Sequence, residues 1–534
     1  MLYLIVHRRS FIKLIGLILS IFSFRIFGYN ENNNEEISFK HGVASGDPTK
    51  NKIILWTKIT KTTKKTINVS WQISDNKNFS NLINSGSAKS YSYNDFSVKV
   101  DAKIPNKYCG SEIYYRFYVN TSFSVTGTTK TLPRKDPNNF NMAICSCSNY
   151  PGGFFNAYKE IANDNNIDMV LHLGDYLYEY DKDGYATEDS KSMNRVVEPQ
   201  HEIVTLDDYR KRHALYKTDE DLQLLHSKKA MVAVWDDHEF TNDSWKYGAE
   251  NHSVDEGSFS LRKANAVKAY YEWMPIRESK AKLKIWRKFE IGTLFQLFML
   301  DTRSIYRDKQ LDLDNYINDD KFEVSRFKKD LLKNRDLVGK EQFQWLDKNI
   351  DNKFKWSVIG QQVLVAPIVL PEIFLKIDKS KIPEYLHKYF KIAGMNIPYN
   401  TDSWDGYPRE REKLYKILSK SQSNIVLTGD THNSWISNLY NQNDEFIAVE
   451  IATPAISSPN TVDTFGSITK DIDNDFVKNN KHLKWTNGLN KGYVKLTITR
   501  DNIKAKFLYV NTVKSKDYYL IDKNQFIVQH KQPL

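Results

Sequence analysis

The chain has 534 residues, more than the ~250 to 300 at which a single hydrophobic core stops growing, so we expect at least two domains or one large domain with an appendage. Forty per cent of the residues are apolar and 26 per cent are charged, which places the chain among soluble globular proteins. The formal net charge is +11, but the basic residues are scattered and form no dense tract. This charge suits an anionic substrate and gives no reason to expect a stable nucleic-acid partner.

Residues 1–30 are expected to direct export. The charged stretch His7–Lys13 precedes an apolar run over residues 14–24, as in a signal peptide. Its Arg-Arg-x-Phe-Ile-Lys form resembles a twin-arginine signal, so we expect the twin-arginine translocase as a partner and a periplasmic or extracellular location. The run is shorter than the ~20 residues that span a bilayer. No Ala-x-Ala cleavage site is visible, so an uncleaved signal that anchors the protein stays open as an alternative.

The chain contains three cysteines, Cys109, Cys145 and Cys147, which are too few for a disulfide scaffold. In an oxidising compartment, a thiol is a liability unless it is paired, buried or held by a metal. Cys147 is therefore a candidate metal ligand, and an inert core residue is the alternative.

Residues 39–135 are predicted to form a β-sandwich. Short β-type runs separated by polar turns occupy residues 53–56, 67–73, 96–102, 113–119 and 124–132. The prolines at 133 and 137 then mark a linker.

Residues 138–515 alternate apolar strands with helical stretches, which predicts an α/β domain, and residues 516–534 are expected to be a tail. The main strand candidates cover residues 140–144, 168–173, 231–234, 294–300, 356–359, 425–427, 446–451, 492–499 and 505–509. Helices are predicted near residues 153–163, 262–273 and 409–420.

Four polar clusters follow predicted strands: Cys147, Asp175, the Asp237–His238 pair, and Asp430 with His432. The carboxyl ends of strands are where α/β sheets gather ligands, so we expect these clusters to meet. Alone, a Gly-Asp pair is more simply a turn. The run from Asp236 to Glu239 is harder to explain without a cation, because three acids around a histidine repel one another.

The order of these clusters resembles the metallophosphoesterase motif series, and longer stretches resemble the alkaline phosphatase D family. These stretches are Gly42–Pro48, Leu55–Thr57, Ser146–Tyr150, His172–Tyr180, Trp235–Glu239, Asn242–Trp245, Tyr270–Ile276, Leu300–Arg303, Trp404–Pro408 and Leu427–His432. They are spread, in order, over nearly all of the chain after residue 30.

The resemblance implies a four-layer αββα catalytic sandwich preceded by an all-β domain of immunoglobulin or fibronectin III type. It also implies hydrolysis of phosphate monoesters or diesters, small phosphate esters as substrates, and Fe3+ and Ca2+ as cofactors. Relatives include exported phosphodiesterases and phospholipase D-type enzymes. We expect a monomer.

The resemblance also implies roles for single residues. Cys147 and Tyr178 would hold the ferric iron, and Asp175 would bridge iron and calcium. The ligands that complete the cluster would be Asp237, Asn242, Asp430 and His432, with Asp236 and Glu239 in support.

In the implied mechanism, the cations activate a hydroxide for in-line attack on phosphorus. His238 would stabilise the transition state or protonate the leaving oxygen. Arg210 would clamp the phosphate, with a solvated helix face as the alternative reading.

The sequence departs from the family pattern at Ser148, where a glutamine is usual, and at Gln361 and Gln362, where a histidine motif is usual. No long C-terminal helix is apparent to cap the site. A phospholipase D-type or nucleic-acid phosphodiesterase, and a cell-surface binding protein without catalysis, are the alternative functions.

Overall fold

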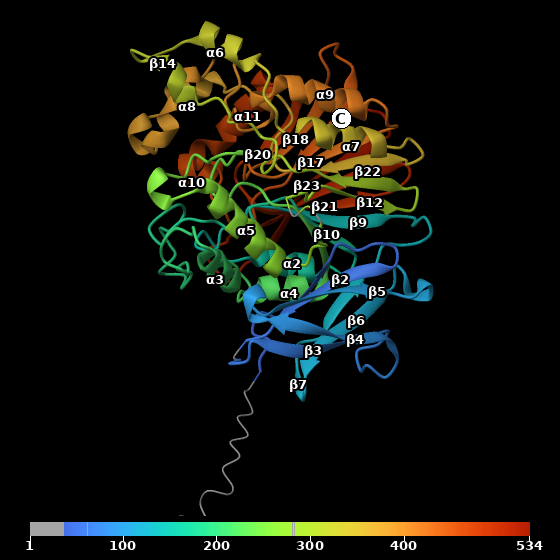
Figure 1. Cartoon of the computed structure of the whole chain (residues 1–534). Coiled ribbons are helices and arrows are strands. Elements are labelled where there is room, and N and C mark those ends of the chain that lie inside the picture. Colours follow the sequence, from blue (N-terminus) through green and yellow to red (C-terminus); the bar gives the residue numbers. More distant parts are fainter. Residues whose placement is uncertain (1–36, 61, 280, 282) are drawn as a thin grey trace, which may run out of the picture.

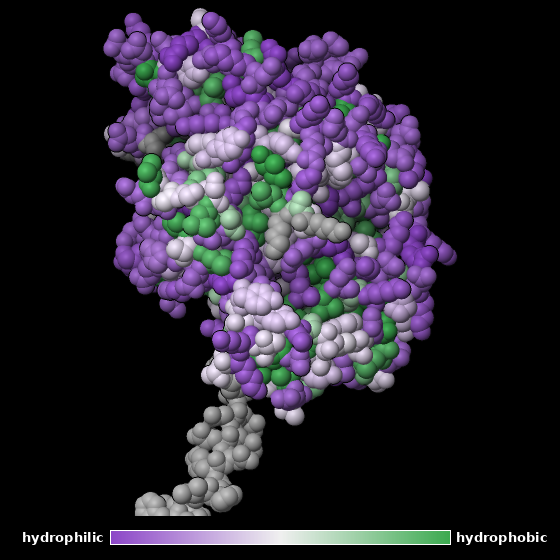
Figure 2. Space-filling view, viewed as in Figure 1, coloured by the Kyte–Doolittle hydropathy of each residue, from purple (hydrophilic) through white to green (hydrophobic). Residues whose placement is uncertain are grey.

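The structure is a computed structural model that describes residues 37–60, 62–279, 281 and 283–534. The expected export segment, residues 1–30, lies outside the described residues. Within the described part of the chain, no helix combines the length and the apolar character that crossing a membrane requires. The face seen in Figure 2 is mainly hydrophilic, with hydrophobic residues in scattered groups.

Two large mixed sheets form the body of the protein (Figure 1). The first has nine strands, in the order β23 (Leu520–Gln529), β22 (Asn502–Val510), β21 (Lys491–Ile498), β9 (Phe140–Cys145), β10 (Met169–His172), β11 (Ala230–Ala233), β1 (Val43–Gly46), β2 (Lys52–Lys58) and β5 (Ser97–Lys103). Strands β9, β10 and β11 run parallel to one another, so their carboxyl ends share one edge.

The second sheet has seven strands. Their order is β12 (Arg287–Ile291), β13 (Phe295–Met299), β16 (Trp356–Gly360), β17 (Asn424–Thr428), β19 (Phe446–Ala452), β18 (Ser434–Tyr440) and β20 (Leu483–Asn487). Strands β13, β16, β17 and β19 are parallel. An isolated parallel bridge between Ser146 and Ala455 joins the two sheets just beyond β9 and β19. The carboxyl ends of both parallel sets therefore meet.

The main core lies between the two sheets, since one cluster of buried side chains contains Met142 and Leu171 of the first sheet and Leu297 and Leu427 of the second. A second core forms between the opposite face of the seven-stranded sheet and its helices; Val426 packs there with Leu414.

The helices are α2 (Asn156–Asn163), α3 (Leu206–Tyr216), α4 (Glu220–Lys228), α5 (Phe259–Trp273), α6 (Val324–Leu331), α7 (Gly339–Asn349), α8 (His387–Ile392), α9 (Pro408–Leu418), α10 (Thr461–Phe465) and α11 (Thr469–Asn479).

Local sequence explains where key helices begin. Helix α3 begins at a capping box, in which the Thr205 hydroxyl accepts from the Asp208 amide and the Asp208 carboxylate accepts from the Thr205 amide. Helix α9 begins with Pro408, whose missing N–H would have no partner in the first turn.

The N-terminal part has two β layers, and one of them is shared with the nine-stranded sheet. One of its sheets consists of β4 (Leu82–Tyr91), β3 (Thr66–Ser74), β6 (Glu112–Val119), β7 (Ser122–Phe123) and β8 (Gly127–Lys130). The facing strands β1, β2 and β5 belong to the nine-stranded sheet, because β1 pairs in parallel with β11. A buried core that includes Leu55 and Val69 fills the space between the two layers.

Most of the predicted strands and helices are confirmed. The runs over 140–144, 231–234, 356–359 and 425–427 are β9, β11, β16 and β17, and the helices over 262–273 and 409–420 are α5 and α9. The prediction of a tail over residues 516–534 is wrong for β23, which pairs with β22 along its length. Its alternating burial was hidden by a run of polar residues.

Asp47, directly after β1, ties the N-terminal part to the second sheet. Its carboxylate accepts hydrogen bonds from Arg287 Nη2 at 2.7 Å and Nε at 3.0 Å, and from the Arg277 amide at 2.7 Å. Only 1% of the Asp47 surface is exposed, and its φ of 42° is left-handed.

We predict that Asp47→Asn lowers the free energy of unfolding by about 3 kcal/mol, because Arg287 loses the charge that balances it. Urea denaturation measures the change. The control is Asp444→Asn, which also replaces a left-handed aspartate but at an exposed ion pair with Lys481, and is expected to cost less than ~0.5 kcal/mol. Equal effects of the two substitutions would contradict this role for Asp47.

Candidate metal centre

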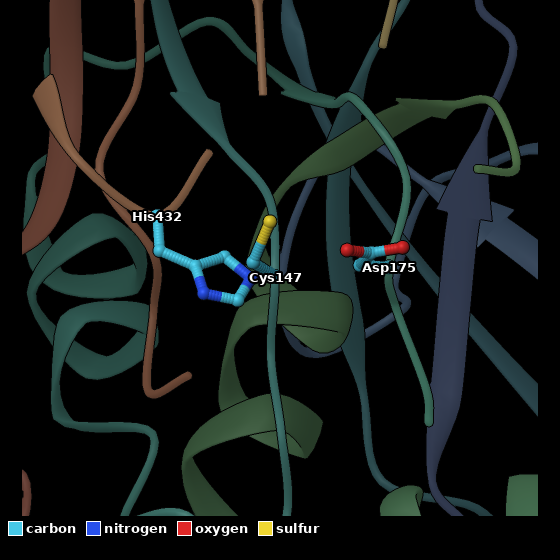
Figure 3. A group of neighbouring side chains, drawn as sticks. All are labelled: Cys147, Asp175 and His432. Carbon is cyan, nitrogen blue, oxygen red and sulfur yellow. The ribbon is translucent and has the colours of Figure 1, made fainter. Parts of the chain in front are cut away.

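The four predicted clusters meet at the shared edge of the two sheets. Ligand-type atoms of Cys147, Asp175 and His432 lie within 4.8 Å of one another, as do those of Asp175, Asp237 and His238. A third group, also within 4.8 Å, contains Asp236, Asp237 and Asp430. Figure 3 shows Cys147, Asp175 and His432 projecting from three separate segments, which follow β9, β10 and β17. The predicted convergence of the clusters is therefore confirmed.

The backbone at these positions takes an unusual conformation. Cys147, Asp175, Asp430 and His432 have φ values of 60°, 53°, 65° and 63°, in the left-handed region that non-glycine residues seldom adopt. Such strain persists where surrounding structure enforces it, and it clusters at functional sites. The sharp turns aim these side chains back across the strand ends.

Two glycines allow the close approach. A Cβ atom at Gly174 would lie 2.4 Å from the Asp236 Cβ atom, and one at Gly429 would lie 2.7 Å from Ser146 Oγ. A larger residue at either position would push apart the segments that carry the clusters.

Tyr178 adjoins two members of the first group, Asp175 and His432. Its hydroxyl lies 3.2 Å from Asp175 Oδ2 and 3.2 Å from His432 Nε2, and it accepts a hydrogen bond from Ser458 Oγ at 2.7 Å. Burial, reinforced by the Asp175 charge, raises the pKa of Tyr178 and of Cys147 well above their usual ranges. A nearby cation would reverse this and favour the phenolate and the thiolate.

The hydrogen bonding of His432 leaves the lone pair of its Nε2 available to a metal ion. Its Nδ1 donates to the Pro459 carbonyl at 2.6 Å, which leaves Nε2 unprotonated and facing Tyr178. Burial lowers the pKa of His432 to about 4, so the ring is neutral at ordinary pH. This is the form in which histidine binds metals.

Arg303 provides the positive charge on the acidic side. It binds both oxygens of Asp402 at 2.7 Å, contacts Asp236 through Nε, and lies 3.4 Å from Asp430 Oδ1. Burial opposes the ionisation of Asp237, but Arg303 and His238 outweigh it and lower the pKa of Asp237 to about 2. This carboxylate is therefore charged over the whole physiological range.

Glu179 holds His238. The two are joined by a hydrogen bond of 2.7 Å from His238 Nδ1 to Glu179 Oε2, and Glu179 is fully buried. Burial opposes a charge on His238, but Glu179, Asp237 and Asp175 together raise its pKa well above its usual range. His238 is therefore a cation whose Nε2 proton is free to be donated.

Glu239 supports the strand ends. Its carboxylate accepts from the amides of Asp175 at 3.0 Å, Tyr176 at 2.8 Å and Asp236 at 2.7 Å. It thus fixes the backbone of two clusters relative to each other, as a supporting group would.

Three buried carboxylate oxygens in the described part of the site have no hydrogen-bond partner: Asp175 Oδ1, Asp236 Oδ2 and Asp237 Oδ1. An unpartnered buried carboxylate oxygen is costly unless a cation meets it. Oxygen donors suit calcium, and a thiolate with a phenolate and an imidazole suits a transition metal such as iron. The donor set therefore fits the two kinds of ion that the resemblance implies.

Two predicted site residues lie elsewhere or at the edge. Arg210 on α3 makes two 2.7 Å hydrogen bonds to Glu272 on α5 and a third to the Tyr93 carbonyl, so the prediction that it clamps phosphate is wrong. Its Nε and Nη2 atoms join α3 to α5 and to the N-terminal part. Asn242 donates through its main chain to Glu179 and through its side chain to Glu250, so its predicted ligand role rests on the remaining amide oxygen.

Sequence reasoning missed Arg303, Glu179 and Asp402. Arg303 ends the Leu300–Arg303 stretch that follows β13, so its place after a strand was the available signal. Glu179 lies within the stretch that follows β10, next to Tyr178. Asp402 follows no strand and gave no signal.

Comparisons with known proteins agree with this geometry. A family model described as PhoD-like phosphatase matches residues 142–507, and one described as its N-terminal domain matches residues 27–133. The chain is 34% identical over 558 residues to alkaline phosphatase D of Bacillus subtilis (strain 168), which covers 98% of this chain and 88% of that protein. The solved structure of PhoD matches with a TM-score of 0.77 at 31% identity, over 92% of this chain and 91% of that one. The resemblance read from the sequence is confirmed, and the chain belongs to the PhoD-like phosphatases, which are phosphoester hydrolases.

Proposed function

We propose that this protein is an exported, metal-dependent phosphoesterase that hydrolyses phosphate monoesters, diesters or both. The observation that carries the proposal is the set of unpartnered carboxylate oxygens on Asp175, Asp236 and Asp237, buried beside a thiol, a phenol and a neutral imidazole. Family membership supplies the reaction class, and the donor set supplies the need for metal ions.

Cys147, Tyr178 and His432 would hold a ferric iron, with Asp175 shared between it and calcium. Asp237, Asp430 and Asn242 would complete the calcium side, and Asp236 is a further candidate because its free oxygen faces the same group. When bound, such ions polarise phosphoryl oxygens and activate water for attack.

His238 is the proposed acid. Its ring is charged and its Nδ1 is fixed by Glu179, so Nε2 can stabilise a phosphoryl oxygen or give its proton to the leaving alcohol. Arg303 neutralises the carboxylates around the site and is too enclosed by Asp236 and Asp402 to replace Arg210 as a phosphate clamp.

We further propose the four-layer catalytic sandwich over residues 138–515 and the immunoglobulin-like domain over residues 39–135. The core between the two sheets and the core between β2 and β3 support these assignments. Export by the twin-arginine translocase, a periplasmic or extracellular location and a monomeric state belong to the same proposal and rest on residues 1–30 and on family resemblance.

Metal analysis tests the centre. The purified protein is expected to contain iron, and Cys147→Ala and Asp175→Ala are each expected to lose iron and at least 100-fold in phosphoesterase activity, as removal of an ion that activates water requires. Cys109→Ala is the control, because Cys109 lies in the N-terminal part, where its thiol donates to the Pro105 carbonyl. Full iron content and activity in both site variants would overturn the assignment.

The partnership of Glu179 and His238 gives a second test. Glu179→Gln is expected to lower kcat by about 10- to 100-fold, and adding it to His238→Gln should cost little more, since the two act as one unit. Because Glu179 raises the pKa of His238, the alkaline limb of the pH–rate profile should move to lower pH in Glu179→Gln.

Glu202→Gln is the matched control. Glu202 is a neighbouring carboxylate that also bonds to Asn251 but pairs with Arg262 instead of a histidine. An unshifted profile in Glu179→Gln, or additive losses in the double variant, would show that Glu179 does not act through His238.

A further inference from the structure

A cavity of about 250 Å³ opens beside the acidic half of the centre. Its lining includes Asp243 and Asp402 at the end nearest the metal-ligand candidates. The Asp243 amide donates to Asp237 Oδ2 at 2.6 Å, and Asp402 is held by Arg303. Two residues of the cavity lining therefore contact groups of the site directly.

Part of the cavity lining is aromatic. Tyr389 and Tyr399 line the cavity and meet edge to face, with ring centroids 6.2 Å apart and an interplanar angle of 61°. Burial and the charge of Asp243 raise the pKa of Tyr389, and burial and the charge of Asp430 raise that of Tyr399. Both rings therefore lie close enough to acidic groups at this end of the site to feel their charge.

Gln310 supplies an unused polar atom. Its Nε2 donates to the Asp243 carbonyl at 3.2 Å, whereas its Oε1 is buried without a hydrogen-bond partner in the described structure. A buried acceptor of this kind is costly until a donor meets it. A ligand hydroxyl in the cavity would be such a donor.

The lining is acidic on balance, because it contains five carboxylates, those of Asp243, Glu250, Asp312, Asp314 and Asp402, and only two lysines, Lys309 and Lys388. Asp402 is neutralised by Arg303, Lys388 lies 3.5 Å from Asp314, and Lys309 stands 4.8 Å from the centre of the Trp245 ring. A negatively charged ligand group would be repelled here. Carboxylates, amides and hydroxyls beside aromatic rings suit a neutral molecule that has both hydroxyl groups and a flat apolar face.

We propose that this cavity binds the alcohol portion of the substrate and selects a sugar ring, stacked on Tyr389 and hydrogen-bonded to Gln310. The volume fits one ring, since a cavity of ~150 Å³ holds benzene and drug-sized ligands need ~300 Å³ or more. The inference rests on the proposed phosphoesterase function and names the substrate class of that site: phosphate esters of cyclic sugars.

Matched esters test it. Glucose 6-phosphate and cyclohexylmethyl phosphate share shape and a primary alkyl leaving group, but the second lacks the hydroxyl groups; ribose 5-phosphate and cyclopentylmethyl phosphate form the five-membered pair. We expect kcat/KM to favour the sugar by at least about tenfold in one of the pairs, because a site built to bond hydroxyls rejects an analogue without them. No preference in either pair would overturn the inference.

Substitutions in the cavity lining test which residues cause the preference for sugar esters. Gln310→Met keeps the length of the side chain and removes the amide, so it should lower the sugar-to-carbocycle ratio of kcat/KM by about tenfold. Tyr389→Ala removes the ring and should raise KM for the preferred sugar ester. Tyr389→Phe keeps the ring and should leave that KM low. Using the ratio cancels any general loss that follows from disturbing Asp243. The control, Gln422→Met, replaces a glutamine outside the cavity that bonds to the Asn352 carbonyl.

The outcomes separate the two proposals. If the wild-type protein hydrolyses para-nitrophenyl phosphate but shows no sugar preference, or if Gln310→Met keeps the wild-type ratio, the cavity does not select a sugar. If it hydrolyses no phosphate ester at all with iron and calcium supplied, the proposed function itself fails.

Discussion

Negative charge held away from water is the constraint on which the rest of this structure depends. Asp175, Asp236 and Asp237 are buried together, and a protein without compensating charge could not keep them ionised there. The side chains of Arg303 and His238 are cations that offset part of this negative charge. The backbone amides that donate to Glu239 fix the segments that carry the carboxylates. Of the remaining oxygen atoms, Asp175 Oδ1 and Asp236 Oδ2 accept no hydrogen bond within the described part of the chain, and Asp237 Oδ1 lies 3.7 Å from Arg303 Nη2. This surplus of buried negative charge is the basis of the proposal that the centre holds metal ions.

The same requirement explains the architecture around the centre. Two parallel strand sets with a common edge can deliver side chains from four segments to one point, which neither sheet can do alone. The short Ser146–Ala455 bridge holds the sheets at the distance that this convergence needs. Left-handed turns at Cys147 and Asp175 then redirect side chains that would otherwise follow the strand direction. Geometry of this kind costs conformational strain, and the enclosing core supplies the stability that maintains it.

The sequence predicted the parts of this arrangement that are local. Apolar runs that end in polar clusters identified β9, β10, β11 and β17 and the ligand candidates after them, because strand and turn preferences act over a few residues. It failed where partners lie far apart in the chain. Arg210 looked suited to phosphate, and only the tertiary fold pairs it with Glu272. Glu179 and Arg303 appeared in recognised stretches, but their roles depend on contacts across 59 and 67 residues, to His238 and Asp236. The sharing of β1, β2 and β5 with the larger sheet was hidden for the same reason.

The pairing of β1 with β11 limits how far the N-terminal part can be separated from the rest of the chain. Only two residue pairs, Ser45 with Ala230 and Gly46 with Met231, define that register, yet they cover the open edge of the parallel strands. A catalytic portion expressed from residue 138 onward would present β11 as a bare, apolar strand edge, which is a template for aggregation. The N-terminal part therefore covers a sheet edge in addition to forming its own core. Recombination that exchanged it for an unrelated domain would have to replace strand β1 as well.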